Sequence, residues 1–206
     1  MRSVNRGPWP TSDDGLQVPI SEYGHAKAPL IERIGEYCSY CERPGDLHVE
    51  HVVPKSICEE LEKEWSNFLL GCGNCNSRKG NGNASREGYL WPDHDNTFAA
   101  FEYEPGGRVC VSEDLSQDEH RRASALFGLV GLGETGTPTD RRRHKRRQAW
   151  DKAVLVRDLL NGENSRVLAV EVALGTGFFS VWMVVFRDDC DMRQRLMDAF
   201  PGTRVE

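Results

Sequence analysis

Alternation of apolar and polar residues predicts short strands in the middle of the chain. Residues 47–53 alternate as a half-buried strand does, after a turn at residues 43–45, and Pro54 ends the run. Residues 98–103 and 108–111 predict two further strands, joined by a turn of proline and glycine. We therefore expect at least one β-hairpin before residue 112.

Helical periodicity dominates the last part of the chain. Helices are expected over residues 118–132 and 140–160, because each run ends at or just before a glycine. The second run carries Trp150, Val154 and Leu155 at helical spacing, which predicts that these residues form its apolar face.

Two more helices are expected near the ends of the chain. Residues 30–37 predict a short helix, and residues 191–200 predict a helix capped by Asp191. The segment 165–186 is ambiguous between helix and strand, and helix is favoured for its first half.

These elements indicate an α+β fold in three parts. Residues 1–29 are an N-terminal arm rich in proline, residues 30–112 form the core, and residues 113–206 form a mostly helical region. The apolar stretch at residues 167–186 is interrupted by Glu171 and by glycines, so a transmembrane span is not expected. The N-terminus has no apolar run that predicts a signal sequence.

Charge is distributed unevenly over an acidic chain. The net charge of −6 argues against a protein that coats nucleic acid without specificity. Six basic residues nevertheless crowd into seven positions: Arg141, Arg142, Arg143, Lys145, Arg146 and Arg147. Such a run is either a solvated helix face or, if the chain has a nucleic-acid site elsewhere, a contact to phosphates.

Two Cys-x-x-Cys pairs are the strongest chemical signal in the chain. Cys38 and Cys41 form one pair, and Cys72 and Cys75 form the other. Four thiolates in this pattern predict a tetrahedral structural zinc site, whereas the competing redox dithiol lacks its usual βαβ context. The remaining cysteines have no such spacing and are expected to be ordinary small buried residues: Cys58, Cys110 and Cys190. A thiolate metal site favours a reducing compartment, and hence the cytoplasm.

Residue types suited to phosphodiester hydrolysis lie between and beside the cysteine pairs. Carboxylate and amide oxygens of Glu50 and Asn76 suit a hard cation such as Mg²⁺, and a neutral imidazole can take a proton from water. Each residue alone is a weak signal. Taken singly, His48 is expected to be a surface or packing histidine, and Asn67 a capping or loop residue.

A second acidic cluster invites a metal assignment but has a simpler interpretation. Asp93, His94 and Asp95 precede a predicted hairpin and follow Pro92. Because Asp recurs in turns for backbone reasons, we expect these residues to form a turn.

The motifs together resemble a known family. The runs YCSYCERPGDLHVEHVVPKS and WSNFLLGCGNCNSRKGN are similar to the HNH endonucleases of the ββα-metal fold, in the variety flanked by a zinc site. The resemblance covers residues 37–81. It implies a zinc-stapled ββα core and metal-dependent hydrolysis of DNA, with nicking or double-strand cleavage left open.

The resemblance also implies individual roles. His51 would be the general base, and Glu50 and Asn76 would hold a catalytic Mg²⁺ or Mn²⁺ ion. Asn67 would tie the following loop to the strand and orient the base. Lys79 would approach the scissile phosphate.

Further implied contacts involve the metal shell and the DNA. His48 would assist the catalytic metal, and the basic run would bind DNA phosphates through Arg142, Arg143, Lys145, Arg146 and Arg147. Because an HNH motif cuts one strand per site, a double-strand break would need two copies, by dimerisation or by successive nicks.

Past residue 81 the layout is similar to small HNH proteins of bacterial anti-phage systems such as Septu, which work with an ATPase partner. An anti-phage role and such a partner are therefore expected. The alternative is a catalytically inactive zinc-ribbon module that binds DNA or protein. Target specificity and preference for DNA over RNA stay open on the sequence.

Overall fold

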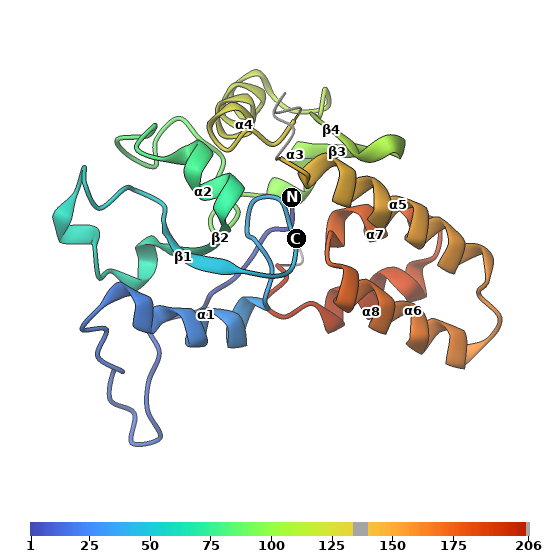
Figure 1. The fold of residues 1–206 in the computed structure, drawn as a ribbon, viewed down its shortest axis with the longest axis horizontal. Helices are drawn as coiled ribbons and strands as arrows, with labels where there is room; N and C mark the ends of the chain where they lie inside the picture. The colour runs from blue at the N-terminus through green and yellow to red at the C-terminus, as the bar shows by residue number, and fades with distance from the viewer. Residues whose placement is uncertain (134–139, 205–206) are drawn as a thin grey trace.

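A β-hairpin followed at once by a short helix forms the centre of the first half of the molecule (Figure 1). The computed structural model describes residues 1–133 and 140–204. Strand β1 (Leu47–His51) pairs antiparallel with β2 (Phe68–Cys72), and helix α2 (Gly73–Lys79) begins at the next residue. The ββα unit confirms the predicted α+β class.

Strand β2 shows why its sequence gave no alternating signal. All five residues of β2 are buried, so the run is continuously apolar except for Gly71. A strand buried on both faces has no polar side to alternate with. In the pairing, Leu47 lies opposite Cys72 and His51 lies opposite Phe68. Because α2 begins directly after Cys72, the helix starts beside the first residue of β1.

A second hairpin follows, with a slightly different start from the predicted one. Strands β3 (Phe101–Glu104) and β4 (Arg108–Val111) pair across the turn η4 (Pro105–Gly107). The first residues of the strand expected at 98–103 instead form the helical turn α3 (Thr97–Ala100), because the Asn96 side chain accepts a hydrogen bond from the Ala99 backbone N–H.

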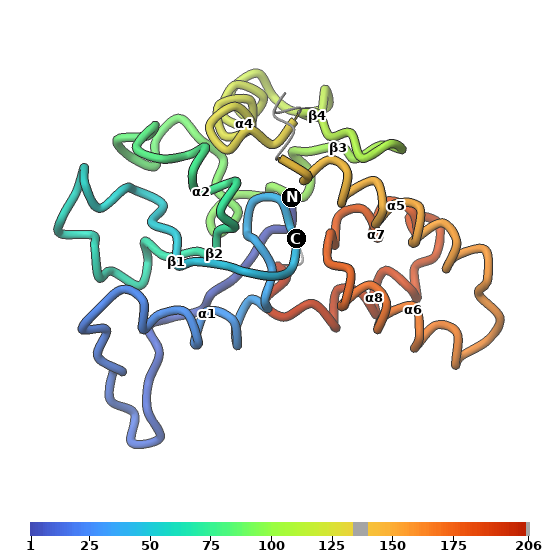
Figure 2. The backbone as a smooth tube through the Cα atoms, viewed as in Figure 1, coloured from blue at the N-terminus to red at the C-terminus, as the bar shows by residue number. Residues whose placement is uncertain are grey.

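The N-terminal segment is more deeply packed than an extended arm. Met1 and Val4 are buried, and Val4 forms a β-bridge with Thr203, so the two ends of the chain meet in the middle of the molecule (Figure 2). A short 3₁₀ turn η1 (Tyr23–Ala26) leads into α1 (Lys27–Ile34), which starts three residues earlier than expected. Pro29 lies in its first turn, where proline removes no intrahelical hydrogen bond.

The last part of the described chain is helical, as predicted. It contains α4 (Gln117–Leu129), α5 (Arg142–Asp158), α6 (Glu163–Thr176), α7 (Phe179–Val185) and α8 (Cys190–Ala199). The ambiguous segment is thus helical in both halves. The cap of α8 is Asp189 rather than Asp191, since its carboxylate accepts from the Met192 N–H. Among the described residues, no helix is long and apolar enough to cross a membrane.

Helix α5 matches the predicted apolar face only in part, since Trp150 and Val154 are partly buried against the core. Its inward positions are Arg142, Arg146, Ala149 and Ala153, whereas Leu155 is 59% exposed. The turn η4 approaches this face so closely that a Cβ on Gly107 (φ 73°) would lie 2.3 Å from the Arg143 carbonyl oxygen. Two alanines and two arginines therefore form the fully buried face of the helix.

Candidate active site and metal centre

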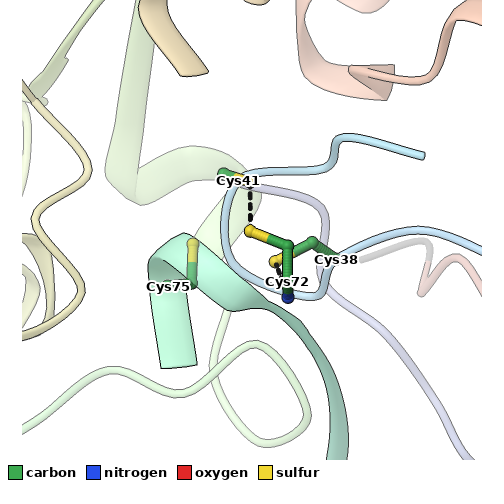
Figure 3. Close-up of side chains that lie close together, drawn as sticks. All are labelled: Cys38, Cys41, Cys72 and Cys75. Atoms are coloured by element: carbon green, nitrogen blue, oxygen red, sulfur yellow. Dashed lines mark hydrogen bonds between the residues drawn. The ribbon is translucent and has the colours of Figure 1, made fainter. Parts of the chain in front are cut away.

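Four cysteine sulfurs converge where the loop before β1 meets the start of α2 (Figure 3). Cys38, Cys41, Cys72 and Cys75 are all buried, and their sulfurs lie within 4.8 Å of one another. The sulfurs of Cys41 and Cys72 are 3.6 Å apart. Ligands at about 2.3 Å around one zinc ion are separated by about 3.8 Å, so the cluster fits a tetrahedral zinc site.

Backbone and side-chain donors surround this cluster. The Cys72 backbone N–H donates to the Cys38 sulfur at 3.3 Å, and Arg142 Nη1 donates to the Cys75 sulfur at 3.2 Å. Donors of this kind offset the excess negative charge of four thiolates around one zinc cation. The sulfur cluster therefore joins the hairpin, α2 and α5.

A separate pocket of about 390 Å³ lies over the other end of α2, between β1, the loop after it and η1. Its lining includes Glu50, His51, Asn76 and Lys79. The fold thus brings together four of the predicted site residues, two from β1 and two from α2. The turn from Cys72 into α2 is what sets the helix beside the strand.

His51 is held in one orientation by its neighbours. Its Nε2 lies 2.9 Å from the carbonyl oxygen of Glu62, which can only accept, so Nε2 carries the proton and Nδ1 keeps a free lone pair. The rings of Tyr23 and Phe68 pack edge-on against it at 5.0 and 5.3 Å. Burial lowers the pKa of His51, which keeps the imidazole neutral near pH 7.

Glu50 forms a buried ion pair. Lys79 Nζ lies 2.9 Å from Glu50 Oε1, and both side chains are almost fully buried. Burial raises the pKa of Glu50, and Lys79 opposes that rise. Gly71 makes room for the carboxylate, because a Cβ there would come within 3.1 Å of Glu50 Cβ.

Lys79 lines the same pocket, and its approach to the scissile phosphate stays a prediction. Besides its ion pair with Glu50, its ammonium donates to the His51 carbonyl oxygen at 2.7 Å. It lines the pocket of His51 from the β1–α2 junction, where these two contacts hold it. Lys79 lies on helix α2, as predicted, and its side chain extends to the buried carboxylate of Glu50.

Asn67 lies where the resemblance placed it, as a link between strand and loop. Its amide oxygen accepts from the Val53 N–H at 2.8 Å, and its Nδ2 donates to the carbonyl oxygens of Val53 and Leu61 at 2.9 and 3.2 Å. The side chain is buried at the end of η3 (Trp65–Asn67). It fixes both ends of the loop whose Glu62 carbonyl orients His51.

Asn76 and His48 differ in their relation to the pocket. Asn76 is half-buried on α2 and lines the pocket, and within the described residues its side chain has no hydrogen-bond partner. His48 is exposed, lies outside the pocket lining and sits 3.9 Å from Asp46. The expected contribution of His48 to the metal shell is not supported, because its side of β1 faces solvent.

Two arginines of the basic run are structural rather than DNA-facing. Arg142 and Arg146 are 2% and 1% exposed. Arg142 pairs with Asp140 at 2.6 Å, and Arg146 donates to the Gly107 and Leu132 carbonyl oxygens at 2.9 and 3.1 Å. Their predicted role in nucleic-acid binding is therefore wrong, because both face the protein interior.

The other residues of the predicted DNA-binding set remain accessible. Lys145 and Arg147 are exposed, and Arg143 is half-buried. Arg147 contacts His144, and Arg143 donates to the Gly106 carbonyl oxygen.

The second acidic cluster forms a turn, as expected. Asp93 pairs with Arg6 and Arg86, and Asp95 accepts from the Trp91 N–H at 2.7 Å and pairs with Arg122. Over residues 1–133 and 140–204, the four cysteines are the one group of three or more His, Cys, Asp or Glu side chains arranged to hold a metal ion. The other three cysteines are not buried as expected, because Cys58 is half-buried and Cys110 and Cys190 are exposed.

Three residues of the pocket region were not found from sequence. Tyr23 packs on His51 from η1, and Lys55 lies over the Tyr23 ring at 4.3 Å while pairing with Glu62 at 2.8 Å. Tyr23 lies in the segment expected to be an arm, twenty-eight positions before His51, and no local pattern links the two.

Comparison with known proteins agrees with this geometry. The sequence model of the HNH endonuclease family matches residues 38–82, the segment that holds both the sulfur cluster and the His51 pocket. The chain is also 33% identical over 87 residues to the Septu protein PtuB of Bacillus thuringiensis, a match that covers 39% of this chain and 34% of that protein. The chain thus spans about a third of the relative's length. Residues 38–82 are a domain of the HNH endonuclease family.

Proposed function

We propose that this protein is a metal-dependent HNH endonuclease that hydrolyses DNA phosphodiester bonds. The observation that carries the proposal is the shared pocket of Glu50, His51 and Asn76, in which His51 has a neutral imidazole and a free Nδ1. The family match of residues 38–82 supports the same reaction class.

In this proposal the protein's own groups divide the work. His51 Nδ1 takes the proton from the attacking water, while the Glu62 carbonyl holds the ring through Nε2. Glu50 and the Asn76 amide oxygen are the candidate ligands of a Mg²⁺ or Mn²⁺ ion, since both are oxygen donors and Asn76 is not otherwise engaged. The ion would stabilise charge on the phosphate oxygens. Lys79 holds the Glu50 carboxylate in place.

The same proposal extends to the sulfur cluster, the exposed cations of α5 and the biological setting. The sulfur cluster is assigned to structural zinc, and the exposed Lys145 and Arg147 stay candidates for contacts to nucleic-acid phosphates. The Septu-named relative supports an anti-phage role, and the ATPase partner is the one that the sequence resemblance implies. A thiolate metal site favours a reducing compartment such as the cytoplasm. A homodimer would allow cleavage of both strands.

A plasmid-nicking assay tests the function. Wild-type protein with zinc bound is expected to convert supercoiled plasmid to nicked or linear DNA in Mg²⁺ or Mn²⁺, and His51→Ala to lose roughly 100-fold to 10,000-fold in rate. The control is His94→Ala, which changes an exposed histidine outside the pocket.

Two results would count against this function. Equal rates for wild type and His51→Ala would remove His51 as the base. Intact plasmid with every metal, both alone and with a defence-system ATPase added, would favour the alternative of an inactive zinc-containing binding module.

A further inference from the structure

A second pocket, of about 410 Å³, lies between the cysteine loop, α5 and the end of α6. Every ionisable side chain in its lining is basic: Arg43, Arg141, Lys145 and Lys152. Its lining shares no residue with the pocket of His51. It is therefore a separate cavity with a strongly positive wall.

The periodicity of α5 explains how one basic run serves two purposes. The inward face of the helix carries positions 142, 146, 149 and 153. The pocket is lined by Arg141, Lys145, Gln148 and Lys152, which repeat the same spacing one residue earlier. Residues one position apart lie about 100° apart around a helix, so these side chains form a neighbouring stripe. The buried arginines hold the helix, and the next stripe presents its cations to the cavity.

In the part of the chain that the structure describes, the cations of this stripe have no acidic partners. Over the described residues, Arg141, Lys145 and Lys152 form no ion pair, whereas other surface arginines do, such as Arg195 with Glu163 at 2.6 Å. Arg43, from the opposite wall, donates to the Asn74 amide oxygen at 3.3 Å. Four cations without a counter-charge on a chain of net charge −6 create a local field that favours an anion.

The walls of the pocket are fixed before any ligand arrives. Gly177 has φ 70°, and a Cβ there would lie 2.6 Å from Pro44 Cδ and 2.8 Å from the Glu42 carbonyl oxygen. The Phe178 backbone N–H donates to that same oxygen at 2.9 Å. The end of α6 is thus locked against the cysteine loop, so binding does not have to order either wall.

We propose that this pocket binds a compact anion that carries several phosphate groups, such as the triphosphate of a nucleotide. Its volume falls within the range of small-molecule sites, about 300–1,000 Å³. The cations line two walls of one cavity, so they can surround a small ligand whose negative charges are close together. The alternative occupant is a nucleic-acid strand, whose phosphates are spaced along its backbone.

Isothermal titration with inorganic triphosphate tests the proposal. The titration is run on the full chain at physiological ionic strength and without divalent cations, so that neither cleavage nor the His51 pocket contributes. Lys145→Glu and Lys152→Glu should each weaken binding by about 10-fold or more, since each replaces a charge-assisted contact with a repulsive one. Arg157→Ala is the control, because it removes an exposed cation of α5 that pairs with Asp158 outside the pocket.

The outcomes separate the occupants. Binding of triphosphate that is tighter than binding of orthophosphate, and is lost in both lysine variants, supports the proposal. A titration that detects no binding of triphosphate overturns the proposal. An unchanged affinity for triphosphate in the two lysine variants also overturns it. A single-stranded oligonucleotide that binds through Lys145 and Lys152 where triphosphate does not would assign the pocket to a DNA strand instead. Both lysines are exposed, and thermal unfolding checks that the variants stay folded.

Discussion

Arg142 donates a hydrogen bond to the sulfur of Cys75, which connects the basic helix α5 to the cysteine cluster. The same guanidinium pairs with Asp140 and donates to the carbonyl oxygens of Val130 and Gly131. One buried arginine thus joins the metal centre, the end of α4 and the start of α5. The contact binds the helical region to the HNH domain through its metal ligand rather than through apolar packing alone.

Replacing Arg142 should therefore destabilise the protein and weaken zinc retention. Arg142→Ala removes the guanidinium that pairs with the buried Asp140 carboxylate at 2.6 Å, and breaking such a buried pair costs about 3–5 kcal/mol. Chemical unfolding with zinc quantification measures both effects. Arg147→Ala, an exposed change on the same helix, should shift stability by less than about 0.5 kcal/mol. Equal, small effects of the two substitutions would contradict the structural role of Arg142.

The same arginine shows where prediction from sequence succeeded and where it did not. The cysteine spacing and the motif around Glu50 and His51 are local patterns, and they predicted the ββα unit and the side chains that share its pocket. A helical period tells which residues share a face of α5, but it does not tell which face meets the protein. That choice depends on the distant turn at Gly107 and on the sulfur of Cys75.

The ion pair of Lys79 could not be predicted, for a related reason. The sequence indicated that Lys79 lies near the pocket, but it did not indicate that the ammonium pairs with the buried Glu50 carboxylate. The Tyr23 contact to His51 was likewise invisible, because it joins segments that no periodicity relates. Pairings between distant segments are set by tertiary packing, and a single sequence records them only indirectly.

Glu50 and Lys79 should be energetically coupled. Lys79→Met leaves a buried carboxylate unpaired, and Glu50→Gln leaves a buried ammonium unpaired, so each single change should be strongly destabilising. The double variant should recover about 0.5–3 kcal/mol relative to the sum of the single changes. Urea unfolding of the four proteins gives the coupling energy. Additive effects would mean that the ion pair does not hold the β1–α2 junction.

Asn67 should affect catalysis through the position of His51. Asn67→Ala removes three hydrogen bonds to the loop, including both to Val53, and should cost about 1–3 kcal/mol. The loosened loop should also lower the cleavage rate, because the Glu62 carbonyl then no longer fixes the imidazole. Cleavage and unfolding are compared with Asn164→Ala, an exposed change on α6. A rate equal to that of the control would separate Asn67 from the active site.

Zinc removal should unfold the HNH domain, whereas loss of the base should not. Structural zinc contributes roughly 10–16 kcal/mol of apparent binding free energy in small zinc domains, and the four sulfurs here clamp both ends of the hairpin segment. Chelation, or Cys72→Ser, should therefore abolish cooperative unfolding and release the metal. His51→Ala should retain full zinc content and a cooperative melt at a modestly lower temperature, since it removes one hydrogen bond to the Glu62 carbonyl oxygen and the ring contacts to Tyr23 and Phe68 but none of the four sulfurs. Thermal melts paired with metal analysis distinguish the two, and an equal loss of stability in both variants would show that the base and the scaffold are not separable.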